Sequence, residues 1–358
     1  MIKSLSQYKE DYRKSVENPA EFWSEYSKSF LWKKEPSNIL SWNFEDPDVK
    51  WFFDGKLNIT ENIFERNKKN ENDTAIIWEP NEPNDKNIEL SYSQLFEEVC
   101  SFSNVLKSLG VKKGDRVIIY LPMIPEAVIS MLACARIGAV HSVVFAGFSA
   151  KSLSDRINDC KAKVVVTSDG NYRGNKTIPV KDVVDEALKT SSSVKSVLTI
   201  NRTNSEIQMV EGRDYWYKDL VKSVKNYCAA EKMDSEDLLF ILYTSGSTGK
   251  PKGVVHTCGG YMIYSQYSFE NIFQYERGDT YWCTADVGWI TGHSYIVYGP
   301  LLSGVRTIMF EGVPNYPTPS RFWDVIDKYD VNQFYTCLLY TSDAADERSS
   351  VDLGGRRI

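Results

Sequence analysis

The chain has 358 residues, of which 42% are hydrophobic and 25% are charged, and these proportions are typical of a globular protein with a large core. A formal net charge of -6 at pH 7 argues against nucleic acid or an anionic membrane as its main partner. The seven cysteines form no Cys-x-x-Cys pair and only three histidines accompany them, so we expect neither a zinc site nor a disulfide framework.

Two further absences bear on the location of the protein. No apolar run reaches the roughly 18 residues that a membrane-spanning helix needs. The N-terminal residues lack the apolar core of a signal peptide. The sequence therefore predicts a cytoplasmic protein whose thiols are reduced.

The segment 1–60 is rich in aromatic side chains. Because aromatic clusters usually pack on a core, we expect a helical and irregular segment that covers the rest of the molecule and contacts no ligand. The aromatic residues concerned are Phe22, Trp23, Tyr26, Phe30, Trp32, Trp42, Phe44, Trp51, Phe52 and Phe53.

An alternation of strands and helices begins after this segment. A strand pattern over 74–78 is followed by a turn over 81–87 and by a capping-box signature at Ser91 and Gln94. The helix that follows has apolar residues at spacings of four and three, and Gly110 ends it. These apolar residues are Leu95, Val99, Phe102, Leu106 and Leu109.

The alternation continues along the chain. Apolar and β-prone runs predict strands over 116–121, 140–145 and 163–167, and helical patterns cover 125–137 and 152–159. Repeated strand–helix–strand units predict an α/β fold built on a parallel sheet.

Two polar stretches follow the strand predicted over 163–167. The first contains Arg173 and Lys176, and since ligands of open α/β sheets bind beyond the carboxyl ends of strands, these cations are candidates to bind a phosphate. Taken alone, their spacing favours the alternative that they are two solvated surface charges, because most surface charges carry no function. The second stretch, 190–206, is predicted to be an exposed loop.

The most informative stretch is the polar loop from Thr244 to Gly253. An apolar run over 238–243 predicts a buried strand before the loop. Val254 and Val255 predict that the chain returns to the core after it.

The composition of this loop suits a phosphate group. Its glycines let backbone N–H groups approach an anion, and its hydroxyl and lysine side chains donate hydrogen bonds to phosphate oxygens. The spacing is not that of a Walker A loop, because Gly249-Lys250 is followed by Pro251 and not by a hydroxyl residue. The alternative is a flexible surface loop, but every residue from Thr244 to Gly253 fits the phosphate-binding pattern.

A second glycine-punctuated segment runs from Asp286 to Ser294, after a strand-like run. From its apolar neighbours, Trp289 is expected to be a core residue. We expect His256 and His293 to be hydrogen-bonded structural residues, because no catalytic triad can be assembled around them.

Five segments together resemble one family. They are 147–150, 172–176, 244–253, 286–294 and 310–317. In these segments the chain is similar to the AMP-forming acetyl-CoA synthetases (acetate–CoA ligases) of the adenylate-forming superfamily. The resemblance extends from about residue 10 to residue 336. The resemblance implies the parallel-sheet βαβ subdomains of that fold, with a partial AMP-binding domain over 61–336 and truncation before the C-terminal domain of the family.

The resemblance also implies a two-step reaction of small molecules, namely ATP, acetate and CoA, with Mg²⁺. A carboxylate oxygen attacks the α-phosphate of ATP to give an acyl-adenylate and pyrophosphate, and the CoA thiol then displaces AMP. A free carboxylate is a poor electrophile and an adenylate is a good one, so the order makes chemical sense. Catalysis would depend mainly on positioning and charge neutralisation.

Site residues are implied by the same resemblance. The ATP polyphosphate contacts are Thr244, Ser245, Gly246, Ser247, Thr248, Gly249, Lys250 and Lys252. The acyl pocket is lined by Trp289, Ile290 and Thr291. The CoA contacts are Gly147, Arg173, Lys176, Thr291 and Asn315. Lys176 stands where some members have arginine, which keeps the charge but loses bidentate geometry.

The catalytic centre itself has no matching residues. The adenine, ribose and AMP-phosphate contacts of the family and its adenylation lysine belong to segments downstream of the matched region. We therefore name no catalytic residue and no metal ligand, and we expect this chain, as an N-terminal piece, to be inactive in acetate-dependent ATP–pyrophosphate exchange. Two alternatives are a ligase for another short acid such as propionate, and a non-catalytic module that binds nucleotide phosphates.

The segment 337–358 does not continue the family pattern, which would read Ala-Pro-Thr after Thr336. Its sequence matches a translated reading frame of a transposase-type sequencing adapter, so we expect a non-native tail that takes no part in the fold. The alternative is a divergent natural tail, and the nucleotide sequence beyond codon 336 distinguishes the two.

Overall fold

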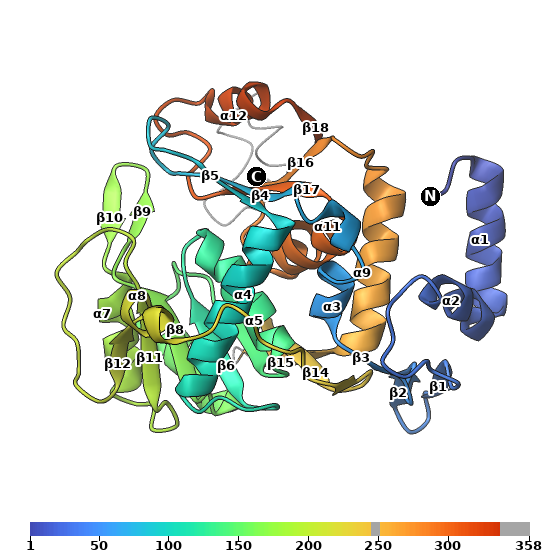
Figure 1. Cartoon of the computed structure of the whole chain (residues 1–358), viewed down its shortest axis with the longest axis horizontal. Coiled ribbons are helices and arrows are strands. Elements are labelled where there is room, and N and C mark those ends of the chain that lie inside the picture. Colours follow the sequence, from blue (N-terminus) through green and yellow to red (C-terminus); the bar gives the residue numbers. More distant parts are fainter. Residues whose placement is uncertain (245–250, 337–358) are drawn as a thin grey trace, which may run out of the picture.

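Two β-sheets form the main body of the protein in the computed structural model, which describes residues 1–244 and 251–336 (Figure 1). The larger sheet has seven strands in the order β12-β11-β8-β6-β7-β14-β15, and the smaller has five in the order β18-β16-β17-β4-β5. Neighbouring strands are parallel except in the pairs β14–β15 and β4–β5. The predicted α/β class with parallel sheets is confirmed.

The strands of the larger sheet are β6 (Arg116–Tyr120), β7 (Val140–Val143), β8 (Val164–Ser168), β11 (Ser196–Ile200), β12 (Asp214–Trp216), β14 (Leu238–Thr244) and β15 (Lys252–Thr257). Those of the smaller sheet are β4 (Thr74–Glu79), β5 (Ile88–Ser91), β16 (Thr280–Cys283), β17 (Arg306–Phe310) and β18 (Val331–Tyr335). Short antiparallel pairs are formed by β1 (Leu40–Asn43) with β2 (Asp48–Trp51), β3 (Lys56–Leu57) with β13 (Met233–Asp234), and β9 (Asn171–Arg173) with β10 (Lys176–Ile178).

The longer α-helices are α1 (Leu5–Glu17), α2 (Pro19–Ser27), α4 (Tyr92–Ser108), α5 (Pro125–Arg136), α6 (Ala150–Cys160), α7 (Val180–Leu188), α9 (Cys258–Phe273) and α12 (Arg321–Tyr329). The shorter ones are α3 (Ile59–Ile63), α8 (Tyr217–Leu220), α10 (Ile290–Gly292) and α11 (Gly299–Leu302). A π-helical segment, His293–Tyr298, joins α10 to α11.

Helices cover both faces of the larger sheet. On β6, Val117 and Ile119 pack with side chains of α4 and α5, whereas Ile118 and Tyr120 pack with side chains of α6 and α7. A strand buried on both faces needs apolar residues at every position, which explains the continuous apolar runs of the sequence.

The predicted start of α4 is confirmed. Ser91 Oγ accepts the backbone N–H of Gln94 at 3.2 Å, and Gln94 Oε1 accepts the backbone N–H of Ser91 at 2.9 Å, which is a complete capping box. Leu95 and Val99 on the same helix are fully buried. Gly110 follows the helix with a φ of +79°, a left-handed conformation that favours glycine.

The stretch 190–206, predicted to be an exposed loop, contains the buried strand β11. β11 lies between β8 and β12, and all five of its residues are buried. The prediction was wrong because Ser196 and Thr199 interrupt the short apolar run of this strand, and such hydroxyl residues are tolerated inside a parallel sheet.

The two valines that follow the polar loop do not lie in the core. Val254 and Val255 are 43% and 53% exposed. They lie in β15, which is an edge strand of the larger sheet, so only one side of it has a strand neighbour. Sequence pattern does not distinguish an apolar edge strand from an apolar central strand, and the prediction was wrong for that reason.

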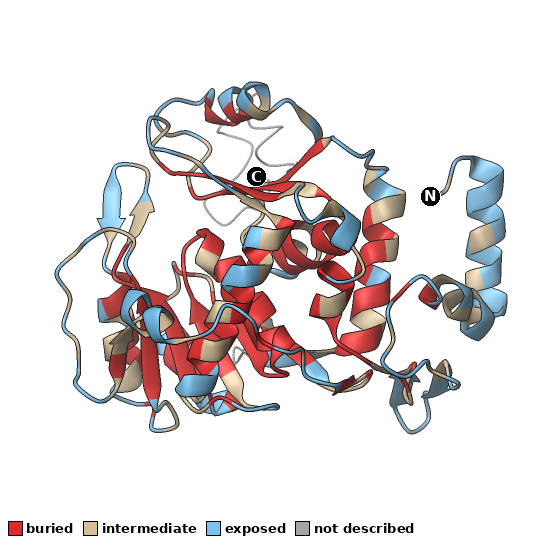
Figure 2. Ribbon diagram, in the orientation of Figure 1, coloured by how far each residue is buried: buried red, intermediate tan, exposed pale blue. Residues whose placement is uncertain are grey.

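The N-terminal segment is only partly a packed cover. Phe30 and Phe52 belong to the core, but Trp42 and Phe44 are 57% and 77% exposed and pack edge-on against each other within the β1–β2 hairpin. Figure 2 shows α1 as exposed and intermediate along its length, and this helix has no buried residue. The expected core packing is therefore wrong for Trp42 and Phe44.

Six cysteines fall within the described residues, and all six are buried free thiols. Burial raises the pKa of Cys160 to about 11 and the pKa of Cys258 and of Cys283 to about 12. In the same part of the chain, no helix is both long and apolar enough to span a bilayer.

Candidate functional site

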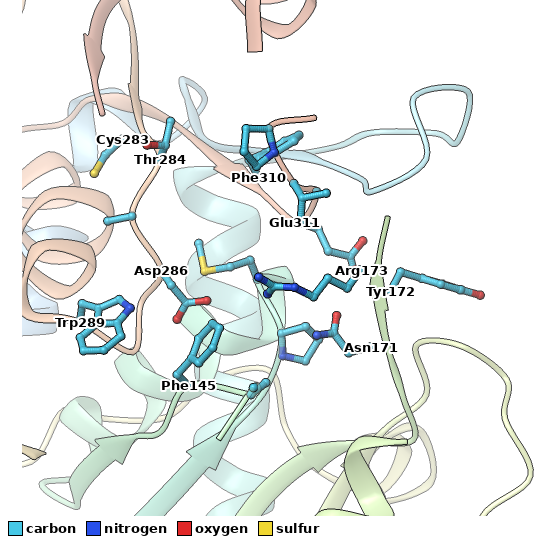
Figure 3. Close-up of a pocket in the computed structure, with 18 of the residues that line it drawn as sticks. Phe145, Asn171, Tyr172, Arg173, Cys283, Thr284, Asp286, Trp289, Phe310 and Glu311 are labelled. Atoms are coloured by element: carbon cyan, nitrogen blue, oxygen red, sulfur yellow. The ribbon is translucent and has the colours of Figure 1, made fainter. Parts of the chain in front are cut away.

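A cavity of about 840 Å³ lies where the carboxyl ends of strands from both sheets meet (Figure 3). Pro122 and Phe145 follow β6 and β7 of the larger sheet, whereas Thr284 and Glu311 follow β16 and β17 of the smaller sheet. Open α/β sheets bind their ligands at this end of the strands. The topology therefore identifies this cavity as the candidate site.

Four of the residues that the sequence analysis named line the cavity. They are Gly147, Arg173, Trp289 and Thr291. They come from three separate segments: the loop after β7, the strand β9, and the start of α10. Figure 3 shows Arg173 extending into the cavity toward Asp286.

Three other named residues do not line it. Lys176 lies opposite Arg173 across the β9–β10 hairpin and is exposed. Ile290 is 44% exposed, and Asn315 is also exposed. None of these three is among the cavity-lining residues that the structure describes.

The predicted phosphate-binding loop is described only at its two ends. Thr244 ends β14, Lys252 begins β15, and these two residues pair across the hairpin. Neither lines the cavity. The other predicted contacts, at 245–250, lie outside the described residues, so the role of this loop stays a prediction.

An aromatic wall forms one side of the cavity. The Trp289 ring centroid is 6.4 Å from that of Phe145 and 6.2 Å from that of Phe148. Trp289 is 51% exposed, so the expectation that it is a core residue is wrong. Its apolar sequence neighbours suggested burial, but the backbone turns its ring toward the cavity.

Asp286 is a carboxyl group with an unusual environment in this cavity. Burial raises the pKa of Asp286 to about 6, although its hydrogen bond from the Gly288 N–H at 2.7 Å and the positive charge of Arg173 offset part of the effect. The group therefore changes its charge close to neutral pH.

We expect Asp286→Asn to raise the free energy of unfolding by about 1–2 kcal/mol at pH 7 and to change it little at pH 4. The folded-state pKa of about 6 lies above the ordinary value of 3.8, so the wild-type protein loses stability as the pH rises between these two values. The amide stays neutral throughout. Urea denaturation at several pH values between 4 and 7 measures the difference.

Asp48→Asn is the matched control, because Asp48 lies in an exposed ion pair with Lys50 and its side chain is 56% exposed. This variant should change the stability by less than about 0.5 kcal/mol at every pH. If the difference in free energy of unfolding between Asp286→Asn and the wild type does not vary with pH, the raised pKa assigned to Asp286 is contradicted.

The three histidines of the chain lie in one aromatic cluster around Phe240. The ring centroids of His141, His256 and His293 are 5.4, 4.4 and 4.6 Å from that of Phe240. Burial lowers the pKa of each imidazole, that of His293 to about 3. His293 Nδ1 bonds the carbonyl oxygen of Trp289 at 3.2 Å, which confirms its structural role, whereas His256 packs by ring stacking.

A charge pair beside the cavity, with the Glu311 side chain fully buried and the Arg202 side chain 17% exposed, was not found from the sequence. Arg202 donates to both carboxylate oxygens of Glu311, from Nε at 2.7 Å and from Nη2 at 2.6 Å, and the Glu311 side chain is fully buried. The guanidinium also lies over the rings of Trp78 and Tyr172. Burial lowers the pKa of Arg202, but its bonds with Glu311 outweigh this effect and the net shift is upward.

The sequence did carry one signal for this pair. Glu311 follows a strand-like run directly, and the rule that ligands lie beyond strand ends would have selected it. Arg202 had no such signal, since it lay in the stretch predicted to be a loop.

Within the described ranges, histidine, cysteine, aspartate and glutamate side chains form no group of three that could hold a metal ion.

Two protein families match this chain, and the matched residues include the segments that converge on the cavity. Residues 63–337 match the family described as AMP-binding enzyme, and residues 8–63 match that described as acetyl-coenzyme A synthetase N-terminus. The two matches together cover nearly all of the described chain.

Three curated relatives are each called acetyl-coenzyme A synthetase. The one from Xylella fastidiosa is 52% identical over 334 residues, which are 92% of this chain and 52% of the relative. The one from Bradyrhizobium diazoefficiens is 53% identical over 334 residues, which are 92% of this chain and 51% of the relative. The one from Bdellovibrio bacteriovorus is 49% identical over 353 residues, which are 96% of this chain and 55% of the relative.

This chain spans about half the length of the curated relatives it matches. The match to the AMP-binding enzyme family covers well over half of the chain. The matched residues, 63–337, include all of the described residues that line the cavity. The chain therefore belongs to the AMP-binding enzyme family, in which it is similar to the acetyl-coenzyme A synthetases.

Proposed function

We propose that this chain supplies the CoA and acyl contacts and the ATP-phosphate loop of an AMP-forming acetate–CoA ligase. The observation that carries the proposal is the convergence of Gly147, Arg173, Trp289 and Thr291 on one cavity. The similarity to proteins called acetyl-coenzyme A synthetase supports the same activity. We propose that the site belongs to an AMP-binding domain over 61–336, with a cover segment over 1–60.

The proposed reaction has two balanced steps. A carboxylate oxygen of acetate attacks the α-phosphorus of ATP, and pyrophosphate leaves to give acetyl-adenylate. The thiol of CoA then attacks the acyl carbon and gives up its proton to the solvent, and AMP leaves with the electron pair of the broken C–O bond. Both steps need anionic groups brought together, so positive charges and hydrogen-bond donors at fixed positions contribute most.

The cavity-lining residues suit the CoA and acyl ends of this chemistry. The guanidinium of Arg173 presents several donors to a phosphate of CoA. Trp289 offers an apolar surface and Thr291 a hydroxyl for the acyl part. We propose that Lys176 and Asn315, which lie outside the cavity, contact CoA at its outer end, and that Ile290 supports the acyl contact from α10.

We expect Arg173→Met to weaken CoA binding about 10- to 100-fold, because a hydrogen bond to a charged group contributes about 1.5–3 kcal/mol. Isothermal titration of the purified protein with CoA gives the affinity. Lys151→Met is the matched control, since it removes an exposed cation of α6 whose side chain is 79% exposed, and it should leave the affinity within about twofold. Equal affinities of wild type and Arg173→Met would contradict the assignment of Arg173.

A chimera tests the activity. Residues 1–336 of this chain are joined to the remaining half of the Xylella fastidiosa relative, and acetyl-CoA formation is measured with acetate and with propionate in parallel. The proposal requires activity with acetate that depends on ATP and CoA. A folded chimera that is inactive, or one that prefers propionate, would contradict it.

A further inference from the structure

Asn81 links the smaller sheet to the β9–β10 hairpin, which carries the cavity-lining Arg173. It lies two residues after β4 of the smaller sheet and is buried, with 3% exposure. Its side chain bonds both backbone groups of Gly174: Asn81 Nδ2 donates to the Gly174 carbonyl oxygen at 2.9 Å, and Asn81 Oδ1 accepts the Gly174 N–H at 2.9 Å. A buried amide that makes two reciprocal bonds fixes the backbone that it contacts.

Gly174 is the turn residue of the β9–β10 hairpin. Arg173 and Lys176 pair across this hairpin, so Gly174 and Asn175 form a two-residue turn. Gly174 has a φ of +58°, as the first central residue of a type II′ turn requires. The turn lies against the Tyr316 ring, and Tyr316 in turn donates to Glu82 at 2.8 Å. Asn81 therefore holds the residue next to Arg173.

The position of Asn81 is itself fixed by the buried charge pair. The backbone N–H of Asn81 donates to Glu311 Oε2 at 3.2 Å, and Glu311 is bound by Arg202. Arg202 is anchored in the larger sheet, because Asp169 at the end of β8 accepts the backbone N–H of Arg202 at 2.7 Å. A continuous set of hydrogen bonds thus runs from one sheet to the other and back to the hairpin.

We propose that Asn81 is a positioning residue that acts through the Gly174 turn to hold the Arg173 guanidinium in the cavity, ready for a phosphate group of the ligand. The inference rests on the proposed function for the identity of that ligand, CoA. Without the two bonds of Asn81, the hairpin keeps its packing against Tyr316 and the contact of Tyr172 with Arg202, but its turn loses both of these fixed hydrogen bonds, and two three-residue strands add little stability of their own. Arg173 would then sample positions outside the cavity, and the ligand would bind only the fraction with Arg173 inside.

The test uses Asn81→Ala, which removes both side-chain bonds and keeps the backbone bond to Glu311. Its matched control is Asn84→Ala, because Asn84 lies exposed in the same loop. Isothermal titration is carried out with CoA and with ATP. We expect Asn81→Ala to weaken CoA binding about tenfold and ATP binding by less than twofold, and Asn84→Ala to change neither.

A double-mutant cycle separates positioning from a general structural role. If Asn81 acts through Arg173, Asn81→Ala should cause no further loss of CoA affinity in an Arg173→Met background. Equal losses in the two backgrounds, or an Asn81→Ala variant that binds CoA as tightly as the wild type, would overturn the inference.

Hydrogen exchange of the peptide 171–178 gives a readout that needs no ligand. We expect faster exchange in Asn81→Ala than in the wild type or in Asn84→Ala, since the Gly174 N–H loses its acceptor. Unchanged hydrogen exchange in Asn81→Ala would overturn the inference, whatever the measured affinity for CoA. Faster exchange together with wild-type protein that does not bind CoA would instead show that the proposed function has failed while the hairpin contact holds.

Discussion

Replacing Arg202 with methionine should lower the free energy of unfolding by about 3–5 kcal/mol, the usual effect of removing one partner of a buried ion pair. The Glu311 carboxylate is fully buried and would lose both of its bonds to the guanidinium. Methionine fills similar space between the Trp78 and Tyr172 rings, so the loss reports the unpaired charge and not a cavity. Urea denaturation at pH 7 measures the effect.

A second substitution tests the cause. Adding Glu311→Gln to Arg202→Met removes the unpaired charge and should restore more than half of the lost stability. Lys151→Met serves again as the control, because its exposed ion pair with Asp155 contributes less than about 1 kcal/mol. If the free energy of unfolding of Arg202→Met is within about 1 kcal/mol of the wild-type value, the pair of Arg202 and Glu311 is not the buried link between the sheets that its geometry indicates.

The second large effect is expected at Glu79, where replacement by alanine should also lower the free energy of unfolding by about 3–5 kcal/mol. Glu79 is fully buried at the end of β4 and accepts from Arg321 Nη2 at 2.7 Å, from Lys328 Nζ at 2.8 Å and from the Tyr329 hydroxyl. All three donors belong to α12. Without Glu79, the buried Arg321 keeps its bond to the Pro80 carbonyl oxygen at 3.0 Å but loses its carboxylate partner, and α12 loses the side chain that binds three of its residues to the smaller sheet.

Denaturation by urea and hydrogen exchange over α12 measure this change. The exchange of the helix should rise more than that of α5, which packs on the other sheet. Lys328→Met is the comparison, because Lys328 is 38% exposed and its removal leaves the bond between Arg321 and Glu79 intact. It should lower the stability by less than about 1 kcal/mol, and an effect as large as that of Glu79→Ala would argue against Arg321 as the cause.

Local sequence signals predicted the fold class well. These signals depend on neighbours only a few residues away, which a sequence displays directly. They are the capping box at Ser91, the apolar spacing along α4, and the apolar runs of β6 and β8. The apolar content of a strand does not say whether the strand is central or at an edge, so Val254 and Val255 were placed in the core. β11 was missed for the opposite reason, since its hydroxyl residues resemble those of a loop.

The candidate site was predictable only in part. Arg173 was named from its place beyond a predicted strand end and again through the resemblance, Thr291 was named through the resemblance alone, and the structure brings both to one cavity. The contacts that hold the cavity walls join residues far apart in the chain: Arg202 with Glu311, and Asn81 with Gly174. No spacing rule selects such pairs, because the fold alone brings them together.

The buried thiols allow local opening of the fold to be measured by chemical labelling. A maleimide reaches a cysteine such as Cys134 only after the surrounding helices separate, so the alkylation rate in a Cys337→Ser background reports how often that part of the fold opens. Among the six cysteines that the structure describes, Cys283 differs from the others in lying on the cavity wall. A small molecule that fills the cavity should therefore delay the labelling of Cys283 and leave that of Cys134 unchanged, and mass spectrometry of the two peptides would map occupancy without any catalytic turnover.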